Sequence, residues 1–347
     1  MAYISFQPND HFNTKLFTGN GSTQSITGVG FQPDWVWIKN REHANHNVVF
    51  DAVRGASKIM YPNLDNVEAT ASGVTAFDSD GFTLGNDSDT NRNSNSHASW
   101  NWKAGGAGSA NTDGSINTTA TSANTIAGFS ISTYTGTGSN ATVGHGLGKV
   151  PEMVVVKQRT GTQWWFTYHI AMGNTKHLAL NSNADVSGAS DDYWNNTTPT
   201  SSVFSIGTDS GSNASGVDFI AYAFAPIKGF SKFGKYKGTG NANGAFIYTG
   251  FKPAYVMARF IGSGNGYDFI IYDKNRPNPS NPAMNILEIN TSDVENTGTA
   301  FHCDFLSNGF KFRGTESNVN DTNAEYLYMA FAEEPLVASN GTPATAR

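Results

Sequence analysis

Charged residues are scarce in this chain of 347 residues. They make up 14% of the sequence, against about 25% in an average soluble protein, and the formal net charge is −6. Proteins that bind nucleic acid usually carry clusters of lysine and arginine, and the sequence has no such cluster. The same lack disfavours binding to an anionic membrane surface.

Cysteine and long apolar runs are also nearly missing. Cys303 is the one cysteine, so no intrachain disulfide can form, and its apolar neighbours predict a small core residue instead of a reactive thiol. No run approaches the roughly 18 apolar residues of a membrane span. The opening MAYISFQPNDHF lacks the basic and apolar regions of a secretory signal, which predicts a protein that the Sec pathway does not export.

Glycine, asparagine, serine, threonine and aromatic residues fill the composition instead. The chain has 37 glycines and is 12% aromatic. This mixture is typical of short strands joined by many turns, because aromatic side chains fill the layers between sheets while glycine and asparagine suit turn backbones. Long helical periodicity is absent, so the composition favours an all-β protein.

Six landmarks recur three times in the same order. Each copy has an aromatic residue with a Gly-x-Gly turn, a proline-led strand, a strand ending in an aromatic and a polar residue, a strand ending in asparagine, a short apolar strand and an aromatic strand. The proline-led strands are FQPDWVWIKNR (31–41), KVPEMVVVKQR (149–159) and FKPAYVMARF (251–260). For the first, second and third copy, the aromatic residue with its Gly-x-Gly turn reads FTGNG, YTGTG and YKGTG, and the strand ending in an aromatic and a polar residue reads VVFD, FTYH and IIYD. The strand ending in asparagine reads KIMYPN, KHLALN and NILEIN, the short apolar strand DGFTLG, SVFSIG and NGFKFR, and the aromatic strand ASWNWKA, FIAYAFA and YLYMAFA. Such recurrence indicates an internal repeat.

The repeat leads to a fold prediction. Each copy has about seven short extended segments in roughly 100 residues, which is typical of a β-sandwich or jelly roll. Trp35 and Trp37 share one face of their strand while Val36 and Ile38 share the other, so this strand should be covered on both sides. We predict three tandem β-sandwich (jelly-roll or lectin-like) modules: residues 1–106 with an N-terminal arm, a linker at 107–127, residues 128–228 and 229–336, and a tail at 337–347.

Patterns typical of catalysis are missing. No nucleophile elbow, Walker A sequence or dinucleotide fingerprint occurs. His43 and His46 lie in a polar turn without a third metal ligand nearby, and GHGLG (144–148) falls at the turn before a proline-led strand. We therefore predict that the protein is not an enzyme and has no catalytic or cofactor-binding residues.

Acidic loops and tryptophans supply the candidate sites. In DSDGFTLGNDSDTNRN (78–93) and its counterparts, the candidate calcium ligands are Asp87, Asp89, Asp209 and Glu316. These loops lack the ligand spacing of an EF-hand, and long hairpin loops explain them equally well. Tyr193 and Trp194 in DDYWNN sit in a polar loop and are expected to be exposed, which makes them the candidate glycan contacts. Packing in a core or an interface is the alternative and the more frequent role of such aromatic residues. Trp164 and Trp165 cannot both point inward, so one is expected to lie against a neighbouring module or to stand exposed.

Several long phrases resemble a domain of tailed-phage virion proteins that is common in marine phages, in proteins described as tail-fibre-like or structural. They are GFQPDWVWIKNR, FDAVRGASK, DSDGFTLGNDSDTNRN and ASWNWKAGG, followed by SKFGKYKGTGNANGAFIYTGFKPAYVM, FLSNGFKFRGT and YLYMAFAEEP. The resemblance spans about residues 10 to 335. It implies a bacteriophage particle component of lectin-like β-sandwich character, and the family has no established functional residues to transfer.

The resemblance and the missing catalytic patterns lead to one functional expectation. The chain would be a virion structural protein on the particle exterior (a tail-fibre, tail-tip or capsid-decoration subunit), assembled in the host cytoplasm and used in assembly and host attachment. Expected partners are other capsid or tail proteins, with a host surface glycan and a homo-oligomer left open, and without nucleic acid or membrane insertion. The alternative is a carbohydrate-binding, lectin-like module for receptor recognition. A polysaccharide depolymerase would need a carboxylate pair, and no Asp/Glu set recurs inside the strands.

Overall fold

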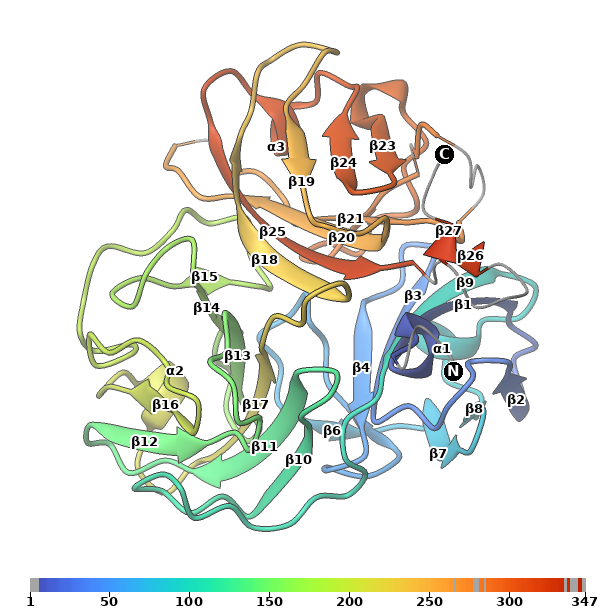
Figure 1. Ribbon diagram of the computed structural model, residues 1–347. Coiled ribbons are helices and arrows are strands. Elements are labelled where there is room, and N and C mark those ends of the chain that lie inside the picture. Colours follow the sequence, from blue (N-terminus) through green and yellow to red (C-terminus); the bar gives the residue numbers. More distant parts are fainter. Residues whose placement is uncertain are drawn as a thin grey trace.

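The computed structural model describes residues 6–264, 266–276, 281–283, 285–333, 336–337 and 343–344. Figure 1 shows three lobes around a common centre, with the first sequence copy in blue, the second in green and the third in yellow to red. The prediction of an all-β protein is confirmed, since the strands that form the lobes pair antiparallel. Helices within the described residues are limited to single short turns.

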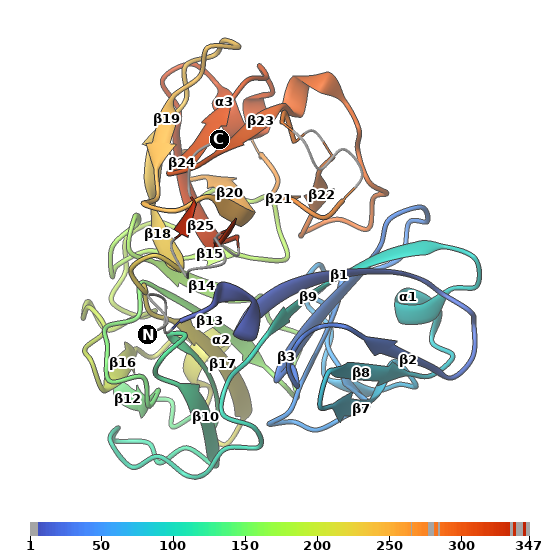
Figure 2. The same cartoon turned by 45° about the vertical axis from the view of Figure 1, so that its right-hand side comes forward.

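The first copy consists of a large and a small sheet. The large sheet has the order β1 (Phe12–Thr18), β9 (Ser96–Trp102), β3 (Trp35–Asn40), β4 (Val48–Asp51), and the small one β2 (Gln24–Thr27), β8 (Gly81–Leu84), β7 (Val74–Asp78). The remaining elements are η1 (Pro8–Asp10), α1 (Ser88–Asn91) and the paired strands β5 (Lys58–Ile59) and β6 (Ala69–Thr70). Figure 2 shows the two sheets as separate layers.

The second copy repeats this plan with a wider large sheet. Its order is β10 (Ala120–Asn124), β11 (Phe129–Thr135), β17 (Asp218–Phe224), β13 (Met153–Gln158), β14 (Phe166–His169), β15 (Leu178–Ala179). The small sheet pairs β12 (Ala141–Gly144) with β16 (Val203–Ile206), and α2 (Ser210–Asn213) follows β16.

The third copy has a large sheet of order β18 (Ser231–Lys237), β25 (Glu325–Ala332), β20 (Pro253–Phe260), β21 (Ile270–Asp273), β22 (Leu287–Glu288). Its small sheet has the order β19 (Phe246–Tyr248), β24 (Gly309–Phe312), β23 (Cys303–Leu306). The helices are η2 (Thr299–Phe301) and α3 (Ser317–Asn320), and β26 (Leu336–Val337) pairs with β27 (Pro343–Ala344).

All three large sheets contain the same four-strand order. In each of them, the strand with the opening aromatic residue pairs with the aromatic closing strand. The closing strand also pairs with the proline-led strand, and the proline-led strand pairs with the next strand along the chain. The three orders are β1-β9-β3-β4, β11-β17-β13-β14 and β18-β25-β20-β21. Pro33 and Pro151 precede their strands and Pro253 opens β20, where a missing N–H costs no interior ladder bond. The recurring sequence phrases therefore occupy equivalent strands.

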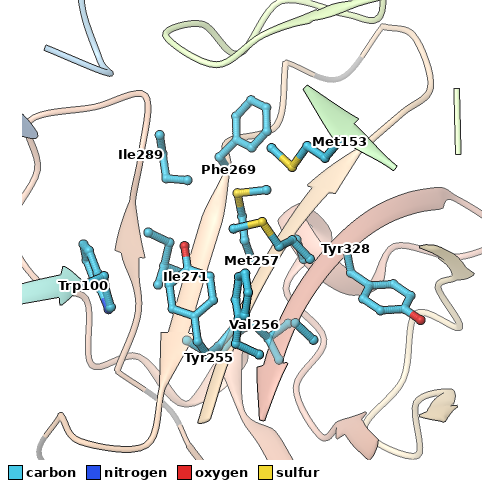
Figure 3. Close-up of a cluster of buried hydrophobic side chains, with 14 of the residues drawn as sticks. Trp100, Met153, Tyr255, Val256, Met257, Phe269, Ile271, Ile289 and Tyr328 are labelled. Carbon is cyan, nitrogen blue, oxygen red and sulfur yellow. The ribbon is translucent and has the colours of Figure 1, made fainter. Parts of the chain in front are cut away.

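Each proline-led strand is buried on both faces, as the alternation in β3 predicts. Val36 and Ile38 belong to a core between the large and small sheets of the first copy, whereas Trp35 and Trp37 belong to a core that all three large sheets share. Figure 3 shows a part of this shared core, where Trp100 and Met153 from the other two copies approach the side chains of β20.

The shared core is centred on three equivalent residues. Trp102 of β9, Phe224 of β17 and Phe331 of β25 form a triangle with ring-centroid distances of 6.5, 5.8 and 6.4 Å. Buried aromatic side chains contribute large apolar areas, about 150–250 Å² each. The copies therefore pack on one another around a pseudo-threefold axis, and not as separate beads on a chain.

The predicted linker 107–127 is in part wrong, and the predicted tail 337–347 lies mostly outside the described residues. Part of the predicted linker 107–127 forms β10, which pairs with β11, and Gly105 N–H donates to Ser122 Oγ over 2.8 Å. Backbone hydrogen bonds do not require apolar side chains, so a polar composition did not exclude an edge strand. Of the predicted tail 337–347, only the pairing of β26 with β27 lies within the described residues.

Candidate functional site

The acidic loops that suggested calcium follow the short apolar strand and contain helices α1, α2 and α3. Asp87 and Asp209 are the N-cap residues of α1 and α2, and each side chain accepts a backbone N–H of its helix, over 2.9 and 2.7 Å. Glu316 has the same position before α3 without a side-chain cap bond. Asp89 Oδ1 accepts the Asn45 side-chain amide over 2.8 Å. Three of these acids therefore occupy helix-capping positions and the fourth fixes a turn.

The four calcium candidates do not come together. They belong to three different lobes, and no group of three or more His, Cys, Asp or Glu side chains that could hold a metal ion occurs among the described residues. Burial is the main factor that raises the pKa of Asp87 and of Asp209. The interpretation as hairpin loops was wrong, since each loop carries the chain from the small sheet to the large sheet. Calcium binding stays a prediction without a grouped ligand set.

A recurring asparagine, which the sequence analysis missed, holds each of these loops. Asn213 of α2 accepts the N–H of Thr137 over 2.8 Å and donates to the carbonyls of Ser139 and Gly207, both over 2.7 Å. The equivalent asparagines Asn91 and Asn320 make the same set of bonds. The signal was in the sequence, because an asparagine follows the capping acid by the same spacing in every copy.

The asparagine bonds explain the Gly-x-Gly turns that open the copies. A Cβ on Gly136 would lie 2.4 Å from the Ala214 carbonyl oxygen, so the loop can approach only a glycine. Gly138 has φ +73°, a conformation that residues with a Cβ rarely adopt. The turn and the helix loop thus form one bonded unit, and its polar groups are used for structure.

The glycan candidates are mostly buried. Trp194 is 2% exposed, donates its indole N–H to the Lys176 carbonyl over 2.9 Å and packs against Tyr168. The expectation that Trp194 is exposed was wrong, because polar neighbours in the sequence do not show whether an aromatic ring turns inward from its loop. Tyr193 is half-buried and packs edge-on against His177.

Trp164 and Trp165 point to opposite sides, as predicted. Trp164 is 46% exposed and Trp165 is 1% exposed. The indole N–H of Trp165 lies 3.0 Å from each of the Tyr61 and Leu64 carbonyls of the first copy. Trp165 therefore lies against a neighbouring copy. Cys303 is fully buried, as its apolar neighbours predicted.

Several buried arginines and carboxylates lie between the copies. We call the contact between the large sheets of the first and second copies the 1–2 seam, and use 2–3 seam and 3–1 seam accordingly. At the 1–2 seam, Arg54 Nε lies 2.5 Å from Asp51 Oδ2, and Arg54 and Arg159 both approach Glu68, at 3.4 and 3.0 Å. Tyr222 of the second copy donates to Asp51 over 2.8 Å. Burial acts to lower the pKa of Arg54, but the carboxylates outweigh it and the net pKa is raised.

The 3–1 seam has the same network. Arg276 Nε lies 2.6 Å from Asp273 Oδ2, and Arg41 Nη2 lies 2.6 Å from Glu295 Oε2. Trp100 of the first copy donates to Asp273 over 3.1 Å, in the role that a tyrosine has at the 1–2 seam. A charged pair that is removed from water must be matched group by group to be tolerated, and here each carboxylate has at least one arginine partner.

The 2–3 seam replaces this network with neutral groups. His169 stands where the other copies have aspartate, and Met172, Val186 and Ile261 stand where the other seams have arginine, glutamate and arginine. His169 Nδ1 lies 3.1 Å from the Ala171 N–H, and Nε2 lies 3.1 Å from the Tyr328 carbonyl of the third copy. These partners require the neutral ring with its proton on Nε2. Burial lowers the pKa of His169 to about 4.

The strongest surface candidate lies on β19, in the third copy. Phe246 and Tyr248 are 46% and 59% exposed, and they stand on alternate positions of the strand, on its outward face. Lys232 Nζ lies 5.1 Å from the Tyr248 ring centroid and donates to the Tyr248 carbonyl over 2.7 Å. Lys311 is opposite Phe246 in the ladder. We call these four residues the β19 face.

The β19 face has no counterpart in the other two copies. The strand register places Ser25 and Thr27 of β2, and Thr142 and Gly144 of β12, at the positions of Phe246 and Tyr248. A shared fold therefore needs no aromatic residues there. The difference is visible in the sequence, where FIY of the third copy aligns with SIT of the first and TVG of the second. The sequence of so short a strand does not show which of its faces is exposed.

Comparisons with known proteins give a family and no activity. A family model described as a domain of unknown function (DUF7483) matches residues 7–335. No curated protein and no solved structure matches the chain. Among the described residues, no helix is both long and apolar enough to span a membrane.

Proposed function

From the premise that the chain belongs to the DUF7483 family, we propose that it is a structural protein on the exterior of a bacteriophage particle. It serves as a tail-fibre, tail-tip or capsid-surface subunit in assembly and host attachment, and acts through protein–protein contacts. The sequence phrases that resemble phage virion proteins support this proposal, and the fold is compatible with it.

The observation that carries the proposal is the closed packing of the three copies. Trp102, Phe224 and Phe331 meet in one core, and arginines and carboxylates at the 1–2 and 3–1 seams are paired with one another. A scaffold of this kind holds its loops in fixed positions, which suits repeated contacts in a particle. The buried ionisable groups at the seams are used for packing, which supports a non-enzymatic role.

Mass spectrometry of purified particles tests the proposal. The chain should be present in mature virions in a fixed ratio to the major capsid or tail proteins, and labelled antibody should bind intact particles because the protein is on the exterior. Absence of the chain from mature particles would overturn the proposal. Release of reducing ends from host capsule by the purified protein would instead support a depolymerase.

A second candidate function is carbohydrate recognition at the host surface. The specific observation that favours it is the exposed aromatic pair on β19, which replaces Tyr193 and Trp194 as the proposed contact. An aromatic ring presents a flat face to the C–H bonds of a sugar ring, and an exposed pair on one strand can contact neighbouring sugar units.

A further inference from the structure

We infer that the β19 face binds an acidic oligosaccharide, with Phe246 and Tyr248 as stacking platforms and with Lys232 and Lys311 as partners of the sugar carboxylates. This inference rests on the second candidate function and is independent of whether the chain is part of a particle. Three features support this inference: the positions of the two rings, the charge beside them and the lack of the same face in the other two copies.

The two aromatic rings are held in place before any ligand arrives. Lys232 covers part of the Tyr248 ring, while a Cβ on Gly309 would lie 2.9 Å from Phe246 Cε2, so the Phe246 ring lies close over this glycine. Alternate residues of a strand are about 6.6–6.8 Å apart, which separates the two rings by roughly one sugar unit. Rings that are already positioned lose little conformational entropy on binding.

The charge on this face favours an anionic partner. Lys232 and Lys311 donate to neutral acceptors, the Tyr248 carbonyl and Asn243 Oδ1, and no ion pair to either lysine occurs among the described residues. Each ammonium has three N–H donors, so donors remain for a carboxylate. Nearby acids partly offset the charge, since Asp304 lies opposite Lys311 but is paired with Arg313 at 3.4 Å.

Glu152 is a further acid whose carboxyl group interacts with the charge of Lys232. Burial raises its pKa, and the charge of Lys232 acts in the opposite direction. Aromatic residues with lysines also suit single-stranded nucleic acid. The net charge of −6 and the lack of a basic cluster disfavour a polyanion that needs many phosphate contacts, so an acidic sugar fits this small, weakly basic platform better.

A binding panel tests the inference with the full chain. Uronate-containing and sialylated oligosaccharides are titrated beside neutral oligosaccharides of the same length and beside an oligothymidylate, with the Kd read by calorimetry. We expect acidic oligosaccharides to bind at least tenfold more tightly than neutral ones, and more weakly as salt rises. No acidic oligosaccharide binding below about 1 mM, equal binding of neutral ones, or tighter binding of the oligothymidylate would each overturn the inference.

Matched variants locate the site on β19. The double change Phe246→Ser with Tyr248→Thr introduces the residues that the first copy has at these positions, so the strand should still form, and it should weaken binding at least tenfold. Lys311→Gln should weaken acidic ligands more than neutral ones. Trp164→Ser alters an exposed aromatic residue elsewhere and should leave binding unchanged. Retained binding in the double variant would overturn the assignment, while particle composition would still test the proposed function separately.

Discussion

The 1–2 and 3–1 seams differ from the 2–3 seam in chemistry but not in position. Each of the first two carries an aspartate, a glutamate and two arginines in contact, with a hydroxyl or indole N–H from the neighbouring copy on the aspartate. The third carries histidine, methionine, valine and isoleucine at the equivalent places. One fold therefore accepts either an ionic or a neutral set of groups at the same joint.

Because the 2–3 seam packs without such a network, the ionic networks are not needed for the packing itself. Burying charges costs several kcal/mol per ion, and the attraction between partners repays this only when the geometry is good. The 2–3 seam avoids this cost at the four equivalent positions and uses neutral side chains there, although the buried Arg259 of the third copy donates to the Ala184 carbonyl of the second copy over 2.7 Å. We infer that the networks make each joint specific for its own neighbour, since an aspartate or arginine that faced the wrong copy would be buried without a partner.

The largest expected effect comes from breaking one ionic seam. Arg54→Met introduces the residue that the second copy has at this position, yet it leaves Asp51 and Glu68 with fewer partners in a buried place. We expect a loss of about 3–5 kcal/mol in the free energy of unfolding, measured by urea denaturation. A loss below about 1 kcal/mol would contradict our description of this seam.

Acid should affect the 2–3 seam. The pKa of His169 is lowered by burial to about 4, against about 6.5 in the unfolded chain, so the unfolded state binds more protons between these pH values. Stability from this group is complete above pH 6.5 and is lost as pH falls toward 4, by about 3 kcal/mol in total.

His169→Gln should remove this contribution to the pH dependence. His97 and His177 also have a pKa lowered to about 4 by burial, and burial lowers the pKa of His11 and His145 as well, so we expect the histidine part of the slope between pH 6.5 and 4 to fall by less than about one third. The measurement is the free energy of unfolding at several pH values. An unchanged slope would show that His169 is not held neutral at this joint.

Exchanging the whole network should cost little. The combined change Asp51→His, Arg54→Met, Glu68→Val and Arg159→Ile gives the 1–2 seam the four residues that stand in place of the ionic network at the 2–3 seam. Since full replacement of a buried ionic cluster by apolar groups is often neutral, we expect unfolding free energy within about 2 kcal/mol of the natural chain. A quadruple variant less stable than Arg54→Met alone would refute the equivalence of the seams.

A surface ion pair gives the smallest effect and serves as the reference. Lys235 Nζ and Glu325 Oε1 are 3.1 Å apart, with side chains 52% and 51% exposed. Lys235→Ala should change the free energy of unfolding by less than about 0.5 kcal/mol. If urea denaturation gave a loss comparable to that of Arg54→Met, burial would not be what distinguishes the seam networks.

Much of the fold was predictable from recurrence and alternation. The phrases led by Pro33, Pro151 and Pro253 form equivalent strands, because strand-forming residues and turn glycines act locally. The predicted linker failed at β10, since pairing with β11 is decided by a neighbouring backbone and not by the composition of the segment.

The candidate site was less predictable. Asp87 and Asp209 stand out in the sequence as possible metal ligands, but a carboxylate in such a loop can equally cap a helix. Trp194 is buried although its polar loop predicts an exposed side chain. Phe246 and Tyr248 are exposed although no sequence pattern marks them as surface residues. Exposure depends on which elements cover a residue, and that information comes from distant parts of the chain.

The amino-acid order by itself determined the all-β character, the three recurring copies of the strand pattern and the doubly buried proline-led strands, because these follow from local preference and a period of two. Tertiary structure alone decided that the three sheets share one core, that acids and arginines far apart in the chain pair across two joints, and that one strand exposes two aromatic rings. Those features arise where surfaces meet, and side-chain spacing within a segment does not specify which surface it will meet.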